Sequence, residues 1–193
     1  MILGFIDTEI TGLRLDKHEV IEFGILRVEL KSDLSLSYID SYSFRIKPLN
    51  IKNADSEALK INGYTEEKWS KAVTQKESLS LIRGCLESCD VLVGQNLICD
   101  LRFIRKSFKK YKQKIMFPSY LDTKQMAEDA GFTETSLDYL CYKYNIKGKA
   151  HTASGDCERT YKVFLKLLEC SIPRYFTFLE PFVVDRNINA KKI

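Results

Sequence analysis

The chain opens with an apolar run that ends in two acidic residues. Residues 1–6 are almost wholly hydrophobic and include one glycine, which is typical of a strand buried on both faces of a sheet. Asp7 and Glu9 follow at once. Because side chains two residues apart in a strand point to the same side, we expect both carboxylates to share one face. Neighbouring anions repel each other, so the pair favours a divalent cation held by oxygen ligands, although a solvated strand end has the same pattern.

The order of the later segments predicts an α/β domain built on a mixed sheet. Strand patterns at residues 19–30 and 36–47 continue the first strand as an antiparallel meander. Short strands are then expected at residues 91–94 and 119–122. Helical patterns cover residues 54–61, 66–71 and 76–89, a stretch that begins at residue 100, and segments around 137–144 and 157–168. A meander followed by alternating strands and helices implies a sheet flanked by helices.

Length and composition indicate a globular protein. A chain of 193 residues fits one domain, and its hydrophobic share of 45% and charged share of 29% are ordinary for a soluble fold. No apolar run approaches the ~20 residues of a membrane span, and no basic leader precedes the first strand, so a cytoplasmic location is expected. Residues 1–170 are expected to form the domain. Residues 171–193 form a C-terminal extension that packs on the domain or docks a partner.

The cysteine pattern does not favour zinc. The six cysteines include no Cys-x-x-Cys pair, and neither histidine lies at a metal-ligand spacing from them. Cys85 and Cys89 fall on one face of an expected helix. Buried free thiols in a reducing compartment are the expectation.

Two later motifs carry polar residues at the starts of helices. Asp100 follows the strand at 91–94, where an aspartate is also a common helix N-cap. Asp156 stands at the front of the last long helix, where it also suits the helix dipole. His151 precedes it by five residues. Positions five apart on a helix point ~140° away from each other, so His151 faces the same site only from the preceding loop. A loop histidine beside a metal is well placed to take a proton from water.

Together these motifs resemble a known family. Asp-x-Glu on the first strand, Asp after Gly-x-Asn-x-x-x, and His-x-x-x-x-Asp are similar to the DnaQ-like, DEDDh-type 3′–5′ exonucleases, which include the proofreading subunit of bacterial DNA polymerase III, RNase T and oligoribonuclease. Residues 21–25 and 61–65 also resemble family segments, and the resemblance covers roughly residues 1–170. Gln95 and Thr152 depart from common family residues without removing a ligand. The resemblance implies an RNase H-like fold with a five-stranded sheet.

The resemblance also implies a chemistry. It is hydrolysis of the phosphodiester at the 3′ end of a single strand, with DNA favoured, by two Mg²⁺ or Mn²⁺ ions and with release of 5′-mononucleotides. Asp7 would bridge the ions, His151 would act as general base, and the ligands would be Asp7, Glu9, Asp100 and Asp156.

The substrate contacts that the resemblance implies are Thr8, Thr11, Gly12, Leu13, Tyr64 and Asn96. The segment from Thr8 to Gly12 would read the terminal 3′-OH. Leu13 and Tyr64 would pack against bases, or else belong to the core. Asn96 would contact the nucleotide or cap a turn. Asp122 is expected to be a helix cap rather than a site acid.

A basic run accompanies these motifs, and the chain carries a net charge of +4. It consists of Arg102, Arg105, Lys106, Lys109, Lys110, Lys112 and Lys114. This run is either a solvated helix face or a guide for the phosphate backbone. The expected partners are a single-stranded 3′ end and, as in the proofreading members, a DNA polymerase or replication subunit.

Three other functions compete with the leading one. The first is RNA 3′ trimming of the RNase T or oligoribonuclease type. The second is a nucleic-acid-binding module that kept the fold without catalysis. The third is a phosphatase with Asp7 as nucleophile, which is disfavoured because Glu9 replaces the second aspartate of an Asp-x-Asp motif.

Overall fold

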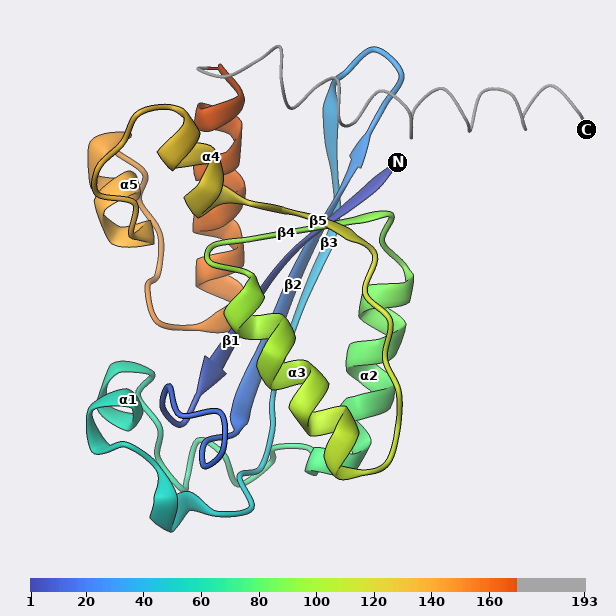
Figure 1. The fold of residues 1–193 in the computed structure, drawn as a ribbon, viewed down its shortest axis with the longest axis vertical. Coiled ribbons are helices and arrows are strands. Elements are labelled where there is room, and N and C mark those ends of the chain that lie inside the picture. Colours follow the sequence, from blue (N-terminus) through green and yellow to red (C-terminus); the bar gives the residue numbers. More distant parts are fainter. Residues whose placement is uncertain (170–193) are drawn as a thin grey trace, which may run out of the picture.

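A computed structural model describes residues 1–169, and these residues form a five-stranded sheet with helices on both faces (Figure 1). The strands are β1 (Ile2–Ile10), β2 (Val20–Leu30), β3 (Leu36–Arg45), β4 (Val91–Gly94) and β5 (Ser119–Asp122). Their order across the sheet is β3-β2-β1-β4-β5. The first three strands pair antiparallel, whereas β1–β4 and β4–β5 are parallel. This confirms the mixed sheet that the sequence predicts.

Each face of the sheet has its own hydrophobic core. On one face, Phe5 of β1 packs edge to face against Tyr161 and Phe164, with ring centroids 5.1 and 5.2 Å away. The helices on this face are α4 (Thr123–Asp129), α5 (Leu137–Lys143) and the last helix, residues 153–169. On the other face, Ile6 packs against α2 (Gln75–Glu87) and α3 (Ile98–Lys110). β1 is therefore the central, doubly buried strand.

Two elements have bounds that differ from the sequence prediction. β1 runs on to Ile10, so Asp7 and Glu9 lie inside the strand and pair with Gly24 and Glu22 of β2. In α3, Asp100 is the third residue, and the N-cap position belongs to Leu97. Both acids of β1 and Asp100 are thus held by regular secondary structure rather than by flexible ends.

The helix predicted at residues 66–71 is wrong. These residues form consecutive turns, which lie between the short helices η1 (Ile51–Asn53) and α1 (Ser56–Ile61) and the start of α2. Trp69 is buried and donates its indole N–H to the carbonyl of Ile21 at 2.8 Å. The contact between Trp69 and β2 fixes another path for this segment.

The sequence pattern gave no bounds for helix α4, although it led us to expect a helix capped by Asp122. It begins after Asp122, whose side chain accepts a hydrogen bond from the Lys124 N–H at 2.9 Å. Asp122 is therefore a helix cap, as expected.

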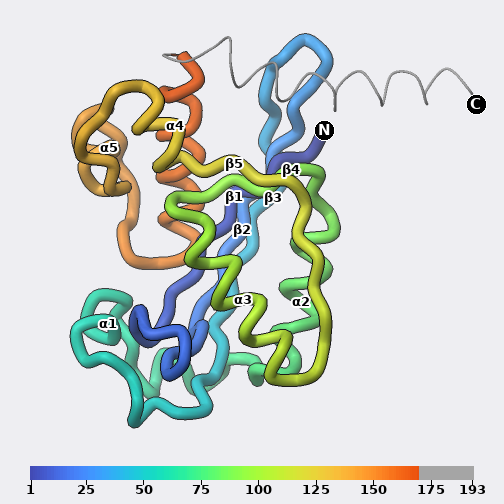
Figure 2. The backbone as a smooth tube through the Cα atoms, in the orientation of Figure 1, coloured from blue at the N-terminus to red at the C-terminus, as the bar shows by residue number. Residues whose placement is uncertain are grey.

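The carboxyl end of β1 lies beside the connection that leads into α1 (Figure 2). Asp55 donates its backbone N–H to the carbonyl of Thr11 at 2.8 Å. The side-chain amide of Asn62 donates to the carbonyl of Ile10 at 3.2 Å. These bonds fasten the segment from Asp55 to Asn62 against the end of the central strand.

The sequence also led to expectations for the cysteines, the C-terminal segment and membrane spans. Cys85, Cys89, Cys99, Cys141 and Cys157 are free thiols, as predicted, and Cys170 lies outside the described residues. The expected extension at residues 171–193 also lies outside them. Within residues 1–169, no helix combines the length and the apolar character that crossing a membrane requires.

Candidate active site

Three carboxylates from two elements meet at the middle of the sheet. One oxygen each of Asp7, Glu9 and Asp156 lie within 4.8 Å of one another. Asp7 and Glu9 point to the same side of β1, as strand alternation predicts. Asp156 reaches them from the first turn of the last helix. A set of carboxylate oxygens at this separation suits a hard divalent cation such as Mg²⁺ or Mn²⁺.

A glycine lets the last helix approach the sheet so closely. Gly24 of β2 is the partner of Asp7 in the ladder. A Cβ at Gly24 would lie 2.5 Å from the carbonyl carbon of Ala153, the first residue of the helix. Any larger side chain would push the helix, and Asp156 with it, away from β1.

Asp100 joins this cluster from the opposite side of β1. Its Oδ1 accepts two hydrogen bonds from Thr8, at 2.9 Å from the backbone N–H and at 2.6 Å from the hydroxyl. Thr8 stands between Asp7 and Glu9 in the strand. The side chain of Asp100 is 8% exposed. A buried carboxylate is thus tied to the strand that carries the other two.

The cluster is strongly unfavourable as a set of bare anions. Burial raises the pKa of Asp7 well above its ordinary value, and the charges of Asp100, Asp156 and Glu9 raise it further. Burial and the neighbouring Asp156 raise the pKa of Glu9 to about 7. Burial also raises the pKa of Asp100 to about 7, against the hydrogen bonds from Thr8. Near neutral pH these groups therefore need protons or a bound cation.

Asp156 differs because it has an internal cation. Arg159, one helical turn further on, donates from Nη1 to Asp156 Oδ1 at 2.6 Å. Arg159 also pairs with Asp138 of α5 and is only 5% exposed. Burial raises the pKa of Asp156, and the Arg159 guanidinium opposes that rise. Sequence reasoning missed Arg159, although its spacing of three residues from Asp156 was the available signal.

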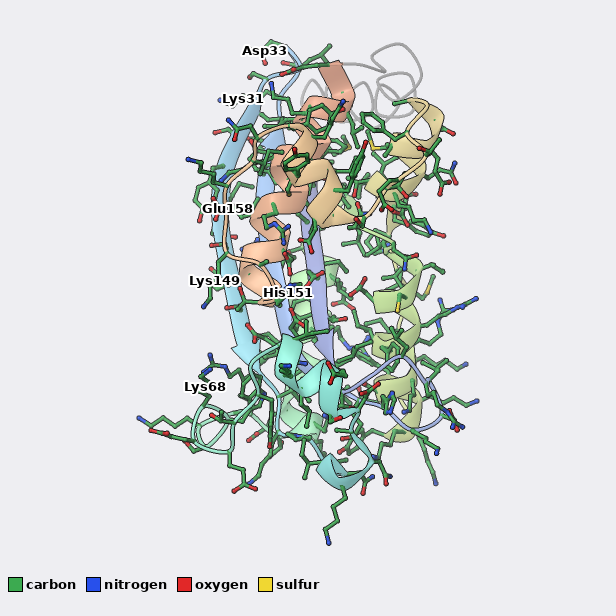
Figure 3. The ribbon with its side chains drawn as sticks, turned by 90° about the vertical axis from the view of Figure 1, so that its left-hand side faces the viewer. Lys31, Asp33, Lys68, Lys149, His151 and Glu158 are labelled. Carbon is green, nitrogen blue, oxygen red and sulfur yellow. The ribbon has the colours of Figure 1, made fainter. Side chains whose placement is uncertain are left out.

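His151 lies in the loop before the last helix, as predicted. Its backbone N–H donates to Asp156 Oδ2 at 2.9 Å, and its φ of 58° is left-handed. Figure 3 shows its side chain on the face that also carries Lys149. A Cβ at Gly155 would lie 2.1 Å from the Lys149 carbonyl oxygen, so this glycine lets the loop fold back over the helix start. The imidazole is exposed beside the carboxylates.

Glu22 is a second residue that sequence reasoning missed. It is 6% exposed and stands opposite Glu9 in the ladder. Burial raises its pKa, and the cations Arg45 and Lys149 and the backbone of Ala153 at the start of the last helix oppose that rise. An acid within the apolar strand at residues 20–30 was the signal for it. Glu22 thus lies where the first turn of the last helix meets the sheet.

The loop after β1 has two structural residues and one exposed apolar residue. The Thr11 hydroxyl accepts a hydrogen bond from the Glu19 N–H at 2.9 Å, which closes the turn into β2. Gly12 has φ of 139°, and a Cβ there would lie 2.3 Å from the His18 ring. Leu13 is 81% exposed next to them. Leu13 is therefore a surface residue, not part of the core.

Tyr64 and Asn96 do not point into the pocket that holds His151. The Tyr64 ring lies 4.9 Å from the Trp69 ring and lines a separate pocket. Ile61, not Tyr64, lines the pocket with His151. Asn96 is exposed in a left-handed turn, and its backbone N–H donates to Asp122 Oδ1 at 2.8 Å.

Comparison with known proteins identifies the family. Residues 5–164 match the RNase_T family, described as exonuclease. The chain belongs to this exonuclease family. Among its relatives, DNA polymerase III PolC-type of Mycoplasma genitalium is 29% identical over 96% of this chain, and 3′-5′ exonuclease DinG of Staphylococcus epidermidis is 30% identical over 85%. The chain covers 12% and 18% of those relatives. Ribonuclease T of Vibrio vulnificus is 25% identical, and the chain covers 89% of it.

Solved structures of nucleases share the fold of this family member. Escherichia coli exonuclease I in complex with a dT13 oligonucleotide superposes with a TM-score of 0.76 at 18% identity, over 92% of this chain and 43% of that one. Cell-death related nuclease 4 gives a TM-score of 0.72 at 16% identity, over 88% and 64%. The sheet order and the flanking helices are thus those of an RNase H-like nuclease, as the resemblance implied.

Proposed function

We propose that this chain is a metal-dependent 3′–5′ exonuclease of the DEDDh type, which acts on single strands and releases 5′-mononucleotides. The observation that carries the proposal is the convergence of Asp7, Glu9 and Asp156, with Asp100 bonded to the same strand. Neither Asp7 nor Glu9 forms an ion pair with a cationic side chain of residues 1–169. A site built this way is suited to metal and phosphate rather than to a neutral ligand.

The donor set fits divalent ions with a preference for oxygen. Asp7, Glu9, Asp100 and Asp156 would hold Mg²⁺ or Mn²⁺, with Asp7 central because it neighbours all the others. When bound, the ions supply positive charge that neutralises the scissile phosphate and the leaving 3′ oxygen. The carboxylates themselves then stay ionised, and the fold holds them in position through β1, α3 and the last helix.

His151 is the proposed general base. Its side chain is exposed beside Asp156, where an attacking water can reach it. The imidazole takes the proton of that water as the water oxygen bonds to phosphorus. The bond between phosphorus and the 3′ oxygen then breaks, and the 3′ oxygen receives a proton from solvent water. The bond from the His151 N–H to Asp156 keeps the loop in register with the carboxylates while the side chain stays free.

The end of β1 is the proposed binding site for the 3′ terminus. Backbone groups from Thr8 to Gly12 would contact the terminal sugar, and the close packing of Gly12 against the His18 ring fixes the path of this segment. Exposed Leu13 and half-exposed Ile61 offer apolar surface to a terminal base of any identity. Tyr64 is a weaker candidate because its ring packs on Trp69.

DNA is the favoured substrate, and RNA is the alternative. The PolC-type relatives favour DNA and a place beside a DNA polymerase. The Ribonuclease T relatives favour trimming of RNA 3′ ends, because the chain covers most of their length.

The test is release of mononucleotides from matched DNA and RNA single strands labelled at either end. With Mg²⁺ or Mn²⁺, the 3′ label should be released first and the 5′ label last. Asp7→Asn should lower the rate by roughly 10³-fold because the central ligand is lost. Glu128→Gln, an exposed acid of α4, is the matched control and should cleave like the unaltered protein. Equal rates for Asp7→Asn and the control would refute the assignment, and a faster rate on RNA would select the alternative.

A further inference from the structure

A basic groove leads away from His151. Two adjoining pockets of about 250 and 380 Å³ share Glu22, Arg45 and Lys68 in their walls. The first also contains His151 and Lys149, and the second also contains Lys71. We define the basic groove by its four cations, Arg45, Lys68, Lys71 and Lys149. Figure 3 shows Lys149 and Lys68 on the same side of the molecule as His151.

The charge of this groove is unbalanced. Its single acid, Glu22, lies on the floor and is 6% exposed, whereas all four cations are exposed. Among residues 1–169, no carboxylate forms an ion pair with Lys68, Lys71 or Lys149. Exposed cations without acidic partners can exchange their counterions for the phosphates of a nucleic acid.

Part of the groove is held in place by the fold. The Arg45 guanidinium lies 4.8 Å from the Trp69 ring centroid and donates to the Lys68 carbonyl at 3.0 Å. The Lys68 ammonium donates to the Gly63 carbonyl at 3.0 Å. Trp69 is itself anchored to β2 through Ile21. Each cation keeps further N–H donors for a ligand, because a guanidinium has five and an ammonium three.

We propose that the basic groove binds the phosphates of the strand on the 5′ side of the scissile bond. The inference rests on the proposed function. If the 3′ terminus occupies the end of β1, the rest of the strand must leave the carboxylates by another route. The groove starts at His151, next to the attacking water, and it is the route whose charge suits a polyanion. It would give affinity for longer strands without reading their sequence.

The basic run at the end of α3 and in the residues just after it offers a matched control. Lys106 donates to the His18 carbonyl at 2.6 Å, and Lys110 pairs with Glu19 at 3.5 Å. These cations stabilise the loop after β1. Lys109 and Lys112 are exposed and line neither pocket of the groove. Removing their charges changes the net charge of the protein as much as removing two groove lysines does.

The experiment compares Lys68→Gln/Lys71→Gln with Lys109→Gln/Lys112→Gln. Binding of a fluorescent single-stranded DNA is measured by anisotropy in EDTA, so that turnover plays no part, over a series of salt concentrations. The groove variant should bind roughly tenfold more weakly, and the slope of log affinity against log salt should fall by about 1.4, since each phosphate contact contributes about 0.7 for single strands. The α3 variant should bind like the unaltered protein. Lys149→Gln removes one charge and should lower the salt slope by about half as much as the double groove variant. Lys68→Arg/Lys71→Arg keeps both charges and should bind like the unaltered protein.

Several outcomes would contradict the proposal that the basic groove binds the strand. One is equal weakening by the groove and α3 variants, which would indicate only a diffuse effect of net charge. Another is a groove variant that loses as much activity on a dinucleotide as on a long strand, because a dinucleotide is too short to enter the groove. The proposed function can fail separately: a protein that binds the strand through these lysines yet releases no nucleotide in any metal has the groove without the nuclease. A protein that degrades strands at unchanged KM after loss of the groove charges has the nuclease without the groove.

Discussion

The two halves of the carboxylate cluster differ in how their charge is balanced. The strand half, Asp7 and Glu9 on β1, has no cationic partner among the ion pairs of residues 1–169. The helix half, Asp156, is held by Arg159 on one oxygen and by the His151 N–H on the other. The strand half therefore needs protons or the proposed cation near neutral pH, whereas the helix half is already oriented by contacts within the chain.

This difference assigns separate tasks to the two halves. Burial and the charges of neighbouring carboxylates raise the pKa values of Asp7 and Glu9. A bound cation would therefore interact most favourably with these two carboxylates of β1, whose charge nothing else balances. The helix half brings the proposed base, His151, to a fixed place relative to that cation. Changes in the helix half should act on rate, and changes in the strand half should act on stability as well.

The largest expected effect among the remaining tests comes from the His151 side chain. His151→Ala should lower nucleotide release by at least ~10²-fold, the usual contribution of a general base. The backbone N–H that binds Asp156 remains in this variant, so the helix half keeps its geometry. His151→Asn is the companion variant, because asparagine tolerates the left-handed backbone at this position but cannot act as a base. If either variant cleaves like the unaltered protein, His151 is not the base.

Arg159 should have the next largest effect. Arg159→Met keeps the length and the apolar stem but removes the bond to Asp156, and we expect roughly tenfold slower cleavage and a higher half-saturating Mn²⁺ concentration. Asp138→Asn is the control, because it alters the other partner of Arg159 and leaves Asp156 paired. Titration of Mn²⁺ by calorimetry separates the effect on metal from that on rate. Tighter Mn²⁺ binding at an unchanged rate would mean that Arg159 competes with the metal rather than positioning its ligand.

The sequence predicted those parts of the site that local geometry determines. The alternation of a strand places Asp7 and Glu9 on one face, and the pitch of a helix places His151 in the loop before Asp156. The motif order also led to the family and to the five-stranded sheet, which the structure and comparisons confirm.

The parts that were missed depend on contacts between distant segments. Residues 66–71 carry a helix-like pattern, but Trp69 is bonded to Ile21 of β2 and the segment follows that anchor. Arg159 is informative only once α5 supplies Asp138 beside it. Neither of these orientations follows from spacing along the chain.

The pH dependence of stability should separate the metal-free state from the metal-bound state. Acids whose pKa is higher in the folded chain than in the unfolded chain stabilise the fold below their ordinary pKa, and this contribution is lost as pH rises through the folded value. For Glu9 and Asp100 the loss falls between the ordinary values near 4 and about 7. In EDTA, the free energy of unfolding should therefore drop by roughly 1–3 kcal/mol between about pH 5 and pH 8.

Urea unfolding at the two pH values, with EDTA or with Mg²⁺, measures this change. Mg²⁺ should restore stability mainly at the higher pH, because only ionised carboxylates bind it. Asp7→Asn should reduce the loss of stability in EDTA, because it removes the anion that repels the others. A metal-free protein that is more stable at the higher pH would contradict the account of the strand half.

The smallest expected effect concerns the bond that ties Asp100 to β1. Thr8→Val keeps the shape of the side chain and the backbone N–H bond but loses the hydroxyl bond of 2.6 Å. Loss of one such bond costs about 1 kcal/mol, so a decrease in stability of that size and a few-fold slower cleavage are expected. The hydroxyl bond lowers the pKa of Asp100, so its loss should also move the onset of cleavage to higher pH. Thr8→Ser retains the hydroxyl and should keep the original pH profile. If valine and serine give the same pH profile, the hydroxyl does not set the charge of Asp100, and the backbone bond alone fastens the strand half of the cluster to α3.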